Sequence, residues 1–449
     1  MTHADDTICA IATAPGVGAI AIVRVSGPNA APLAERLFRT RESLRERYAT
    51  YGTVVDERGE AIDKGIAILS RGPHTYTGED TLELQLHGSP VLAGETMRAA
   101  IACGARAATA GEFTRRAFVN GRLDLHAAAS VADLIAAESR SAARAALANL
   151  GGGLANEVRA LRARLASVLE ELAAALDFPD EVPEPEPARV RAEVDAIVAS
   201  LQRLRADGEI GRLVREGVNV AIVGPPNAGK SSLLNALLGE ERALVSEIAG
   251  TTRDTIEEAI AIDGVRVRIV DTAGIRAHAD RLEAAGIERS QRALESARIA
   301  LLVLDGSEPL GPDAEALLAR TDDRARVTLF NKADLGDAGV REVAGERVAG
   351  SVRDRATLDA IRAALARVGW GGTAPDLERP HIASALEFDA VNDALRSLDD
   401  AARTLARGEA TDFVARDLQN AHAALGRVTG DEATEELLDG IFARFCIGK

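Results

Sequence analysis

Gly224-Pro-Pro-Asn-Ala-Gly229-Lys230-Ser231 is the stretch that decides the fold of the middle of this chain. It matches the pattern Gly-x-x-x-x-Gly-Lys-Ser/Thr, with a strand predicted before it over Val218–Val223 and a helix after it over Ser232–Leu238. Glycines let successive backbone N–H groups turn toward one centre, and the helix adds its positive N-terminal end. The pattern predicts a phosphate-binding loop in which Lys230 bridges the β- and γ-phosphates and Ser231 ligates Mg²⁺. A chance glycine turn is the alternative.

Two later segments supply further candidates for the metal and the phosphates. Thr251-Thr252 lies in a polar loop, where the Thr252 hydroxyl is expected to be a second ligand of Mg²⁺. Asp271-Thr-Ala-Gly274 ends the predicted strand Val265–Val270, which places its carboxylate beside the metal and its glycine N–H near the γ-phosphate. Both segments follow the phosphate loop in the order that a nucleotide-hydrolysing domain requires.

A fourth segment, Asn331-Lys-Ala-Asp334, follows the predicted strand Arg326–Phe330 and indicates which base is bound. The Asp334 carboxylate can accept two parallel hydrogen bonds from N1 and N2 of guanine, a pair that adenine cannot offer. With this segment the chain resembles the Ras-like P-loop GTPases. The next base-contacting loop, Ser351-Val-Arg353, departs from the Ser-Ala-Lys/Arg that is usual there.

The residue after Asp-x-x-Gly leaves open which group orients the attacking water. In Ras-like switches this residue is a Gln, but here it is Ile275, which cannot hydrogen-bond to water. Either hydrolysis is very slow or another side chain takes the role. Glu283 is our candidate, although from the residues alone a solvated carboxylate on a helix is the better interpretation of it.

Length and pattern together predict three domains. At about 150 residues per domain, 449 residues suggest three. Residues 1–120 mix short apolar runs with helical stretches, residues 121–216 and 376–449 are helical, and residues 217–375 alternate strands with helices. We therefore expect a multidomain α/β and α protein, in which an α/β domain with a parallel, doubly wound sheet is inserted into a helical domain.

Individual elements follow from the spacing of apolar residues. In the first domain, strands are expected over Ala19–Val25, Ile66–Leu69 and Leu82–Leu86, and helices over Ala30–Phe38 and Val91–Ala102. From Leu123 the chain becomes long alanine-rich helix, in which Leu154 to Leu176 form a continuous apolar stripe that stops at Asp177. The acidic, proline-rich residues 179–187 are expected to form a linker or a sharp reversal before a helix over Arg189–Arg215. A further strand is expected over Ile299–Leu304.

Charge and composition narrow the cellular setting and the partners. The net charge is −16, so any contact with a nucleic acid must use local patches or a basic partner. The sequence has no apolar run of about 18 residues and no basic segment of a secretory signal, which predicts that it neither spans a membrane nor is secreted. Its three cysteines are isolated, as is typical of a reducing compartment. A cytoplasmic protein is expected.

Motifs along the whole chain resemble one family. Beside the phosphate loop and Asp271-Thr-Ala-Gly-Ile-Arg276, they are Asp6-Thr-Ile8, Ala14-Pro-Gly-Val-Gly18, Arg24-Val-Ser-Gly27, Tyr76-Thr-Gly-Glu-Asp80, His87-Gly88, Gly111-Glu-Phe-Thr-Arg-Arg-Ala-Phe-Val-Asn120, Leu123-Asp-Leu125, Leu176-Asp-Phe-Pro179 and Phe445-Cys-Ile-Gly-Lys449. The chain resembles the tRNA modification GTPases of the MnmE (TrmE) family. It departs from the family at Ala110 for proline, Arg122 for lysine, Ser89 for glycine, and Pro225 in the phosphate loop.

This resemblance implies an architecture, a reaction and partners. The Ras-like GTPase domain would be inserted into the helical domain and preceded by an N-terminal α+β domain that is similar to folate-binding domains and forms a homodimer. A FAD-containing, MnmG-type partner would complete a heterotetramer that acts on tRNA. Together they would add a carboxymethylaminomethyl or aminomethyl group at C5 of the wobble uridine, with a one-carbon unit from a tetrahydrofolate derivative (5-formyl or 5,10-methylene). K⁺, instead of an arginine finger, would activate GTP hydrolysis, since it supplies positive charge near the phosphates.

Site residues carry over by position from the same resemblance. K⁺ would be held by Asn227, Ser246, Ile248 and Thr251, and Mg²⁺ by Ser231 and Thr252, while Glu283 would orient or deprotonate the water. Folate would contact Arg24, Glu83, Arg122 and Lys449. The nucleotide would contact Asn227, Ala228, Gly229, Lys230, Ser231, Ser232, Ser246, Glu247, Ile248, Ala249, Gly250, Thr251, Thr252, Asp271, Thr272, Ala273, Gly274, Asn331, Lys332, Ala333, Asp334, Ser351, Val352 and Arg353.

For two residues, and for the function itself, a second interpretation stays open. A lone cysteine such as Cys446 is most often a buried small apolar residue, whereas the resemblance places it near the folate as a candidate reactive thiol. His87 at a strand end is better interpreted as a turn residue than as a catalytic base. The alternative function is a regulatory or ribosome-assembly GTPase whose N-terminal domain senses a metabolite. The segment Cys446–Lys449 and the folate positions favour the enzyme, because a pure switch has no need of them.

Overall fold

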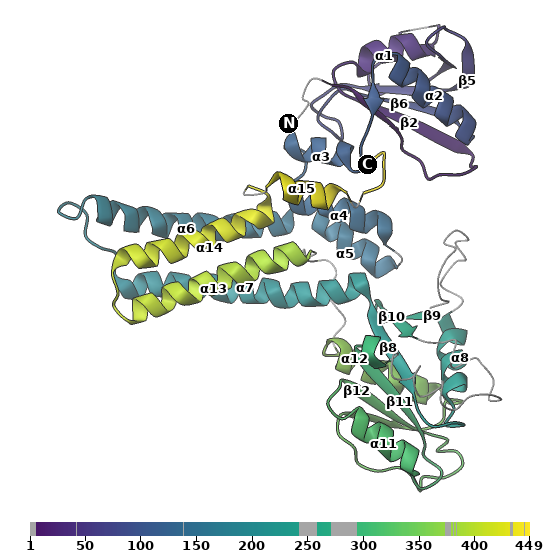
Figure 1. The fold of residues 1–449 in the computed structure, drawn as a ribbon, viewed down its shortest axis with the longest axis vertical. Coiled ribbons are helices and arrows are strands. Elements are labelled where there is room, and N and C mark those ends of the chain that lie inside the picture. Colours follow the sequence, from purple (N-terminus) through teal and green to yellow (C-terminus); the bar gives the residue numbers. More distant parts are fainter. Residues whose placement is uncertain are drawn as a thin grey trace. The chain divides into compact units, whose positions relative to one another are not determined.

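The chain folds into two compact units (Figure 1). The computed structural model describes residues 6–41, 43–137, 139–241, 258–270, 294–372, 379, 381–382, 384–431, 434–443 and 445–449. Unit 1 comprises residues 1–136, 149–203 and 383–449, and unit 2 comprises residues 137–148 and 204–382. Within the described ranges, no helix is both long enough and apolar enough to cross a bilayer. Unit 2 thus interrupts unit 1 in the sequence.

The N-terminal part of unit 1 is a sheet with helices on one face. Its seven strands, in the order β3-β4-β5-β6-β2-β1-β7, are β1 (Ile8–Ile11), β2 (Ile20–Ser26), β3 (Phe38–Arg39), β4 (Thr50–Val55), β5 (Ala61–Ser70), β6 (Thr81–His87) and β7 (Arg106–Ala107). Neighbours are antiparallel except β1 and β7. Side chains alternate between the two faces of a strand. Val23 and Val25 therefore enter the core under α1 (Ala30–Leu37) and α2 (Pro90–Ala102), while Arg24 lies on the other face.

The helical part of unit 1 is built from segments that are far apart in the sequence. Its helices are α3 (Glu112–Val119), α4 (Leu125–Ala136), α6 (Gly153–Asp177), α13 (Ala385–Ala406), α14 (Thr411–Thr429) and α15 (Glu435–Phe442), while α5 (Arg140–Leu150) and α7 (Pro187–Glu216) each continue from one unit into the other. Helix α14 packs against both α6 and α13 (Figure 1). The salt bridge between Arg164 and Glu193 joins α6 to α7, at 2.6 Å between Nε and Oε1.

The expected apolar stripe of α6 is confirmed over most of its length. Leu154, Val158, Leu161 and Leu165 are buried at helical spacing, so the stripe faces the neighbouring helices. Leu176, the last residue of the expected stripe, is exposed, because α6 ends one residue later at Asp177. The long helix expected from Leu123 is also divided into α4, α5 and α6. Gly152, with φ of +72°, turns the chain between α5 and α6 in a conformation that helices do not use.

Unit 2 contains a six-stranded sheet in the order β13-β12-β11-β8-β10-β9. The strands are β8 (Val218–Val223), β9 (Glu258–Ile262), β10 (Val265–Val270), β11 (Ile299–Asp305), β12 (Arg326–Asn331) and β13 (Glu346–Ala349). All neighbours are parallel except β9, which pairs with β10 in an antiparallel hairpin. This antiparallel edge was not predicted from the sequence. Its signal is the dipeptide Asp263-Gly264, both with positive φ, which is typical of a tight hairpin turn.

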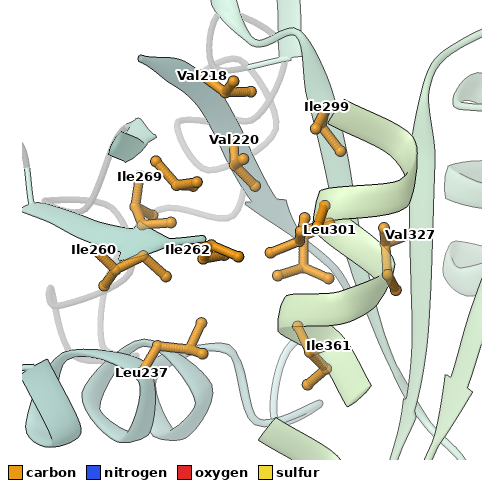
Figure 2. Close-up of a cluster of buried hydrophobic side chains, with 14 of the residues drawn as sticks. Val218, Val220, Leu237, Ile260, Ile262, Ile269, Ile299, Leu301, Val327 and Ile361 are labelled. Carbon is orange, nitrogen blue, oxygen red and sulfur yellow. The ribbon is translucent and has the colours of Figure 1, made fainter. Parts of the chain in front are cut away.

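Helices cover both faces of this sheet and make it doubly wound. Along β11, Ile299 and Leu301 point into a core with α8 (Lys230–Glu241) and α12 (Arg355–Trp370), shown in Figure 2. The alternate residues Leu302 and Leu304 point into a second core with α11 (Pro312–Arg320). A strand that is buried on both faces must be apolar throughout, which explains why β11 could be read from the sequence. The expected multidomain α/β and α fold, with an inserted α/β domain, is confirmed.

Candidate functional site

The loop between β8 and α8 has the backbone that the glycine pattern predicts. Gly224 lies so close to β11 that a Cβ atom there would be 2.1 Å from the carbonyl oxygen of Val303. Gly229 has φ of +101°, and a Cβ there would be 2.2 Å from Nδ2 of Asn331. Asn227 also has a positive φ, of 60°. A side chain at either glycine would displace a neighbouring element, so both glycines are required for this turn.

Lys230 opens helix α8 and folds back over the loop. Its ammonium donates to the carbonyl oxygens of Gly224 at 2.8 Å and Pro225 at 2.7 Å. Burial lowers the pKa of Lys230. Among the described residues its partners are neutral carbonyls, so this half-buried cation is suited to receive an anion such as a phosphate. Ser231 follows in the first turn of α8, where the helix N-terminus favours anions.

Asn331 connects the phosphate loop to the loop after β13. Its side chain is buried, with 2% of the residue exposed. Nδ2 donates to the carbonyl oxygen of Ala228 at 2.8 Å, and Oδ1 accepts from the backbone N–H of Val352 at 3.0 Å. Three segments that the sequence analysis predicted separately are therefore held together by one amide.

The other residues of the predicted base loop lie beside Asn331. The Ala333 N–H donates to the carbonyl oxygen of Gly350 at 3.1 Å, which pairs the two base loops. Asp334 is exposed, and one of its oxygens is 3.9 Å from the exposed guanidinium of Arg353. The Val352 side chain is buried, so this residue offers the site its backbone and not its side chain. Arg353 follows it at the surface, next to the carboxylate that is expected to read guanine.

The remaining predicted nucleotide and metal contacts lie outside the described residues. They are Ser246, Glu247, Ile248, Ala249, Gly250, Thr251, Thr252, Asp271, Thr272, Ala273, Gly274 and the candidate Glu283. Ile275 lies outside them as well.

A second polar site lies on the face of the N-terminal sheet that α1 and α2 leave uncovered. Arg24 and Glu83 are directly opposite each other on β2 and β6. Nε and Nη2 of Arg24 lie 3.0 Å and 2.9 Å from Oε1 of Glu83, and the side chains are 19% and 29% exposed. Arg24 also donates from Nη1 to the carbonyl oxygen of Gly448 at 3.3 Å, and it stacks on Phe113 with Cζ 5.9 Å from the ring centre.

Residues 445–449 bring Lys449 to this pair. Ile447 forms an antiparallel bridge with Ala110, and Gly448 has φ of +103°, with the position of its missing Cβ 2.6 Å from the carbonyl oxygen of Ile11. Only glycine fits so close to β1. Nζ of Lys449 lies 5.9 Å from the ring centre of Tyr76. Burial and, after it, Arg24 lower the pKa of Lys449, whereas Glu83 opposes this shift.

Three of the four predicted folate residues are thus neighbours, and the fourth is joined to them indirectly. Arg122 donates from Nε to the carbonyl oxygen of Thr75 at 3.1 Å, next to Tyr76. The hydroxyl of Tyr76 is 2.8 Å from that of Thr114. The aromatic rings of Tyr76 and Phe113 contact Lys449 and Arg24 and were not among the predicted candidates, although both lie inside motifs quoted above. An aromatic ring within a motif of charged residues was the signal.

Cys446 and His87 have different surroundings from each other. The interpretation of Cys446 as a buried apolar residue is wrong: Cys446 is exposed, because the bridge at Ile447 holds this segment at the surface of the sheet. His87 is the last residue of β6 and is exposed. Its Nδ1 lies 2.9 Å from Oδ1 of Asp63. Burial opposes the shift, but hydrogen bonds from His87 and Lys64 lower the pKa of Asp63.

Several motif residues form a charged network with one another and with Arg106. Arg106 bonds Asp6 at 2.6 Å and Glu112 at 2.5 Å, and Arg116 contacts Asp6, Glu79 and Glu112. Burial by itself would raise the pKa of Glu112, but the hydrogen bonds from Arg106, Thr109 and Arg116 together with the charge of Arg106 lower it to about 2. These pairs tie the loop before β6 to α3 and satisfy one another, so their place in the motifs has a structural reason.

Comparisons with known proteins identify the family. Residues 7–122 match the model described as "GTP-binding protein TrmE N-terminus", and residues 125–446 match the model described as "MnmE helical domain". The chain is 44% identical to the tRNA modification GTPase MnmE of Chloroflexus aurantiacus over 99% of this chain and 100% of that protein. It is 43% identical to the one of Symbiobacterium thermophilum over 99% and 100%, and 44% identical to the one of Laribacter hongkongensis over 100% of both. The chain therefore belongs to the MnmE family, and it is a GTP hydrolase of tRNA modification.

Proposed function

We propose that the GTP site of this chain is organised around Asn331. Its two hydrogen bonds hold the phosphate loop at Ala228 and the base loop at Val352 at one fixed separation. A nucleotide needs both loops at once, because its triphosphate and its base bind at opposite ends. Asp334 would accept the two N–H groups of guanine, and Lys230 would exchange its two carbonyl partners for phosphate oxygens. This bridging amide is the observation that carries the proposal.

We also propose metal ligands at the phosphate end. Ser231 and Thr252 would hold Mg²⁺, and Asn227, Ser246, Ile248 and Thr251 would hold K⁺. The described donors fit hard cations, since Ser231 offers a hydroxyl and Asn227 an amide oxygen on an exposed, left-handed turn. When bound, the two ions supply positive charge at the phosphates. Glu283 would orient the attacking water, because Ile275 cannot.

For the whole reaction we propose a folate-dependent modification of tRNA. Arg24, Glu83, Arg122 and Lys449 would bind a tetrahydrofolate derivative, with the cations on its carboxylates and the Glu83 carboxylate on its N–H groups. A homodimer and a FAD-containing, MnmG-type partner would complete a cytoplasmic heterotetramer. It would add a carboxymethylaminomethyl or aminomethyl group at C5 of the wobble uridine. The domain limits proposed for this assembly are residues 1–120, 121–216 with 376–449, and 217–375.

The test of this function is the nucleoside content of tRNA. A strain without this gene is complemented with the wild-type chain, with Lys230→Ala or with Thr328→Val, which alters a buried hydroxyl on β12 outside the site. We expect hypermodified wobble uridine with the wild type and Thr328→Val, and its loss with Lys230→Ala, by mass spectrometry. Unchanged modification in the deletion strain would contradict the proposal and favour a regulatory GTPase.

Potassium activation has a separate test. GTP turnover is measured in K⁺ and in Na⁺ at the same ionic strength, for the wild type and for Asn227→Ala. We expect a marked rise in K⁺ for the wild type and a much smaller difference for the variant. Equal wild-type rates in the two salts would remove K⁺ from the proposal and leave the GTP site itself untouched.

A further inference from the structure

Asp305 lies at the edge of the sheet where the nucleotide loops lie, although no sequence motif includes it. It is the last residue of β11, and the parallel pairing of β11 with β12 places it opposite Asn331. Ligands of open α/β sheets bind at the carboxyl ends of the strands. The turn after β11 is held to the base loop by the Gly306 N–H, which donates to the carbonyl oxygen of Asn331 at 2.7 Å.

The Asp305 carboxylate joins its own turn to a side chain of the base loop. Oδ1 accepts hydrogen bonds from the N–H and the hydroxyl of Ser307, at 3.0 Å and 2.6 Å. Oδ2 lies 2.6 Å from Nζ of Lys332. Burial opposes ionisation, but the contacts with Lys332 and Ser307 lower the pKa of Asp305. The carboxylate is therefore charged at neutral pH, and Ser307 holds it in place together with Lys332.

The backbone of Lys332 fixes the other end of its side chain. Its φ is 66°, in the left-handed region that long side chains rarely adopt. Its carbonyl oxygen accepts from the Leu335 N–H at 2.8 Å, which closes a turn. A free lysine side chain loses rotamer entropy when it is ordered. Here the salt bridge has already ordered it, so a ligand that contacts it does not bear that cost.

We propose that Asp305 is a positioning residue for guanine nucleotides: its salt bridge holds the Lys332 side chain in one conformation beside the site of the base. The inference rests on the proposed GTP site, where Asp334 reads the edge of the base. Asp305 and Lys332 are 30% and 31% exposed, so the pair lies at an accessible surface and not in a core.

The experiment measures the affinity and dissociation rate of a fluorescent N-methylanthraniloyl GDP on the full chain. The variants are Asp305→Asn, Lys332→Met and the double variant, each checked by thermal unfolding. Lys332→Met keeps an apolar stem and remains informative where Asp305→Asn fails to fold. The matched control is Glu346→Gln, which removes the salt bridge with Arg367, at 2.9 Å between Nε and Oε1, elsewhere in unit 2.

We expect Asp305→Asn to weaken binding roughly fivefold, mainly through faster dissociation, as for a partly exposed ion pair. The KM for GTP should rise more than kcat falls. The double variant should be no weaker than Lys332→Met alone, because both changes break one contact. High salt should accelerate dissociation from the wild type more than from Asp305→Asn. Glu346→Gln should bind like the wild type.

Two results would overturn the inference without touching the GTP site. One is that Asp305→Asn has a nucleotide affinity within twofold of the wild-type affinity, when the wild type does bind the nucleotide. The other is additive losses in the double variant. A wild type that binds no guanine nucleotide at millimolar concentration would instead overturn the proposed site on which the inference rests.

Discussion

The two candidate sites are assembled in different ways. In unit 2, the phosphate loop and the base loops follow β8, β12 and β13 directly, so strand ends at one sheet edge bring them together. In unit 1, Arg24 and Glu83 lie within the sheet face, while Lys449 arrives from the far end of the sequence. The first site depends on a sheet edge, whereas the second depends on the docking of one short segment.

This difference predicts which changes each site tolerates. A nucleotide loop that follows a buried strand keeps its position as long as the sheet is folded, so only its own buried contacts are critical. The second site needs the segment 445–449 to stay on β1 and on Arg24, and these contacts are few. Three of the changes below alter one site and are measured at both, with GTP as the ligand of one and 5-formyltetrahydrofolate as the ligand of the other; a fourth alters a buried pair of unit 1 outside both sites.

Loss of the bridging amide should have the largest effect. Asn331→Ala leaves the carbonyl oxygen of Ala228 and the N–H of Val352 without their partner. Each buried, unpaired group costs about 1–3 kcal/mol. We expect unit 2 to lose several kcal/mol of unfolding free energy in urea, and GTP affinity to fall by about a hundredfold. Folate affinity should stay at the wild-type level, by calorimetry.

The matched control for that variant is on the same strand. The hydroxyl of Thr328 on β12 is buried and has no hydrogen-bond partner within the part of the chain that the structure describes. Thr328→Val should therefore leave GTP affinity unchanged and unit 2 at least as stable. Equal losses of GTP affinity in the two variants would show that any buried change in β12 disturbs the site, and the role of Asn331 would be contradicted.

Removal of residues 446–449 should have the next largest effect, and on the other site. The truncation deletes the Lys449 ammonium and the Gly448 carbonyl that Arg24 holds. We expect folate affinity to fall roughly ten- to a hundredfold, since charged hydrogen bonds contribute about 1.5–3 kcal/mol each. GTP affinity should not change. Cys446→Ala is the control, because the side chain of Cys446 is exposed. If Cys446→Ala lost as much folate affinity as the truncation does, the assignment of the effect to Gly448 and Lys449 would be contradicted.

A change of pH should alter the free energy of unfolding of unit 1, and this effect should be intermediate in size. His126 of α4 is fully buried, and its Nδ1 lies 2.7 Å from Oε1 of Glu387 on α13. Burial by itself would lower the pKa of His126, but the Glu387 carboxylate raises it above the ordinary 6.5. The stabilisation is therefore complete below pH 6.5 and is lost as pH rises through the raised pKa.

Urea unfolding of the wild type and His126→Gln between pH 6 and 9 measures this contribution. We expect the variant to be less stable by about 1–3 kcal/mol at the acidic end, with a smaller difference at the alkaline end. His87→Gln is the control, because that exposed histidine also contacts a carboxylate. A difference for His126→Gln that is independent of pH would mean that the pair is not ionised.

Arg122→Lys should have the smallest effect. Among the described residues, Arg122 is joined to the folate site by its hydrogen bond to the Thr75 carbonyl. Lysine keeps the charge and loses the planar donor group. We expect folate affinity to change by less than about threefold, with GTP affinity unchanged. A loss as large as that of the truncation would place Arg122 in direct contact with the ligand and narrow the contrast between the sites.

The structure could be predicted from the sequence where the residues of a single segment determine its conformation. Strands Val218–Val223 and Val265–Val270 were predicted with the bounds that the structure has. The first is nearly all apolar, as is typical of a buried parallel strand, whereas the second alternates buried apolar residues with less buried ones. The glycines of the phosphate loop could also be predicted, because its tight turn needs a positive φ or a close approach of the backbone that only glycine allows. The hairpin edge β9 was missed because its signal is only a two-residue turn.

The sequence was less informative where several segments meet. No spacing in the chain shows that Arg24 and Lys449 are neighbours; only the family resemblance brought them together. The exposure of Cys446 depends on a bridge to Ala110, more than 300 residues away in the sequence, and the local apolar neighbours gave the opposite impression. Asp305 lies in no motif, and its contact with Lys332 needed the strand pairing to become visible.

The insertion of unit 2 into unit 1 has a thermodynamic consequence. Residues 204–382 form a loop that starts and ends in unit 1. If this loop unfolds, closing its about 180 residues costs unit 1 an entropy on the order of 4–5 kcal/mol. A folded insert holds the two ends at a set separation and removes most of this cost. Nucleotide that stabilises unit 2 by mass action should therefore also raise the melting temperature of the helical bundle that flanks it in the sequence.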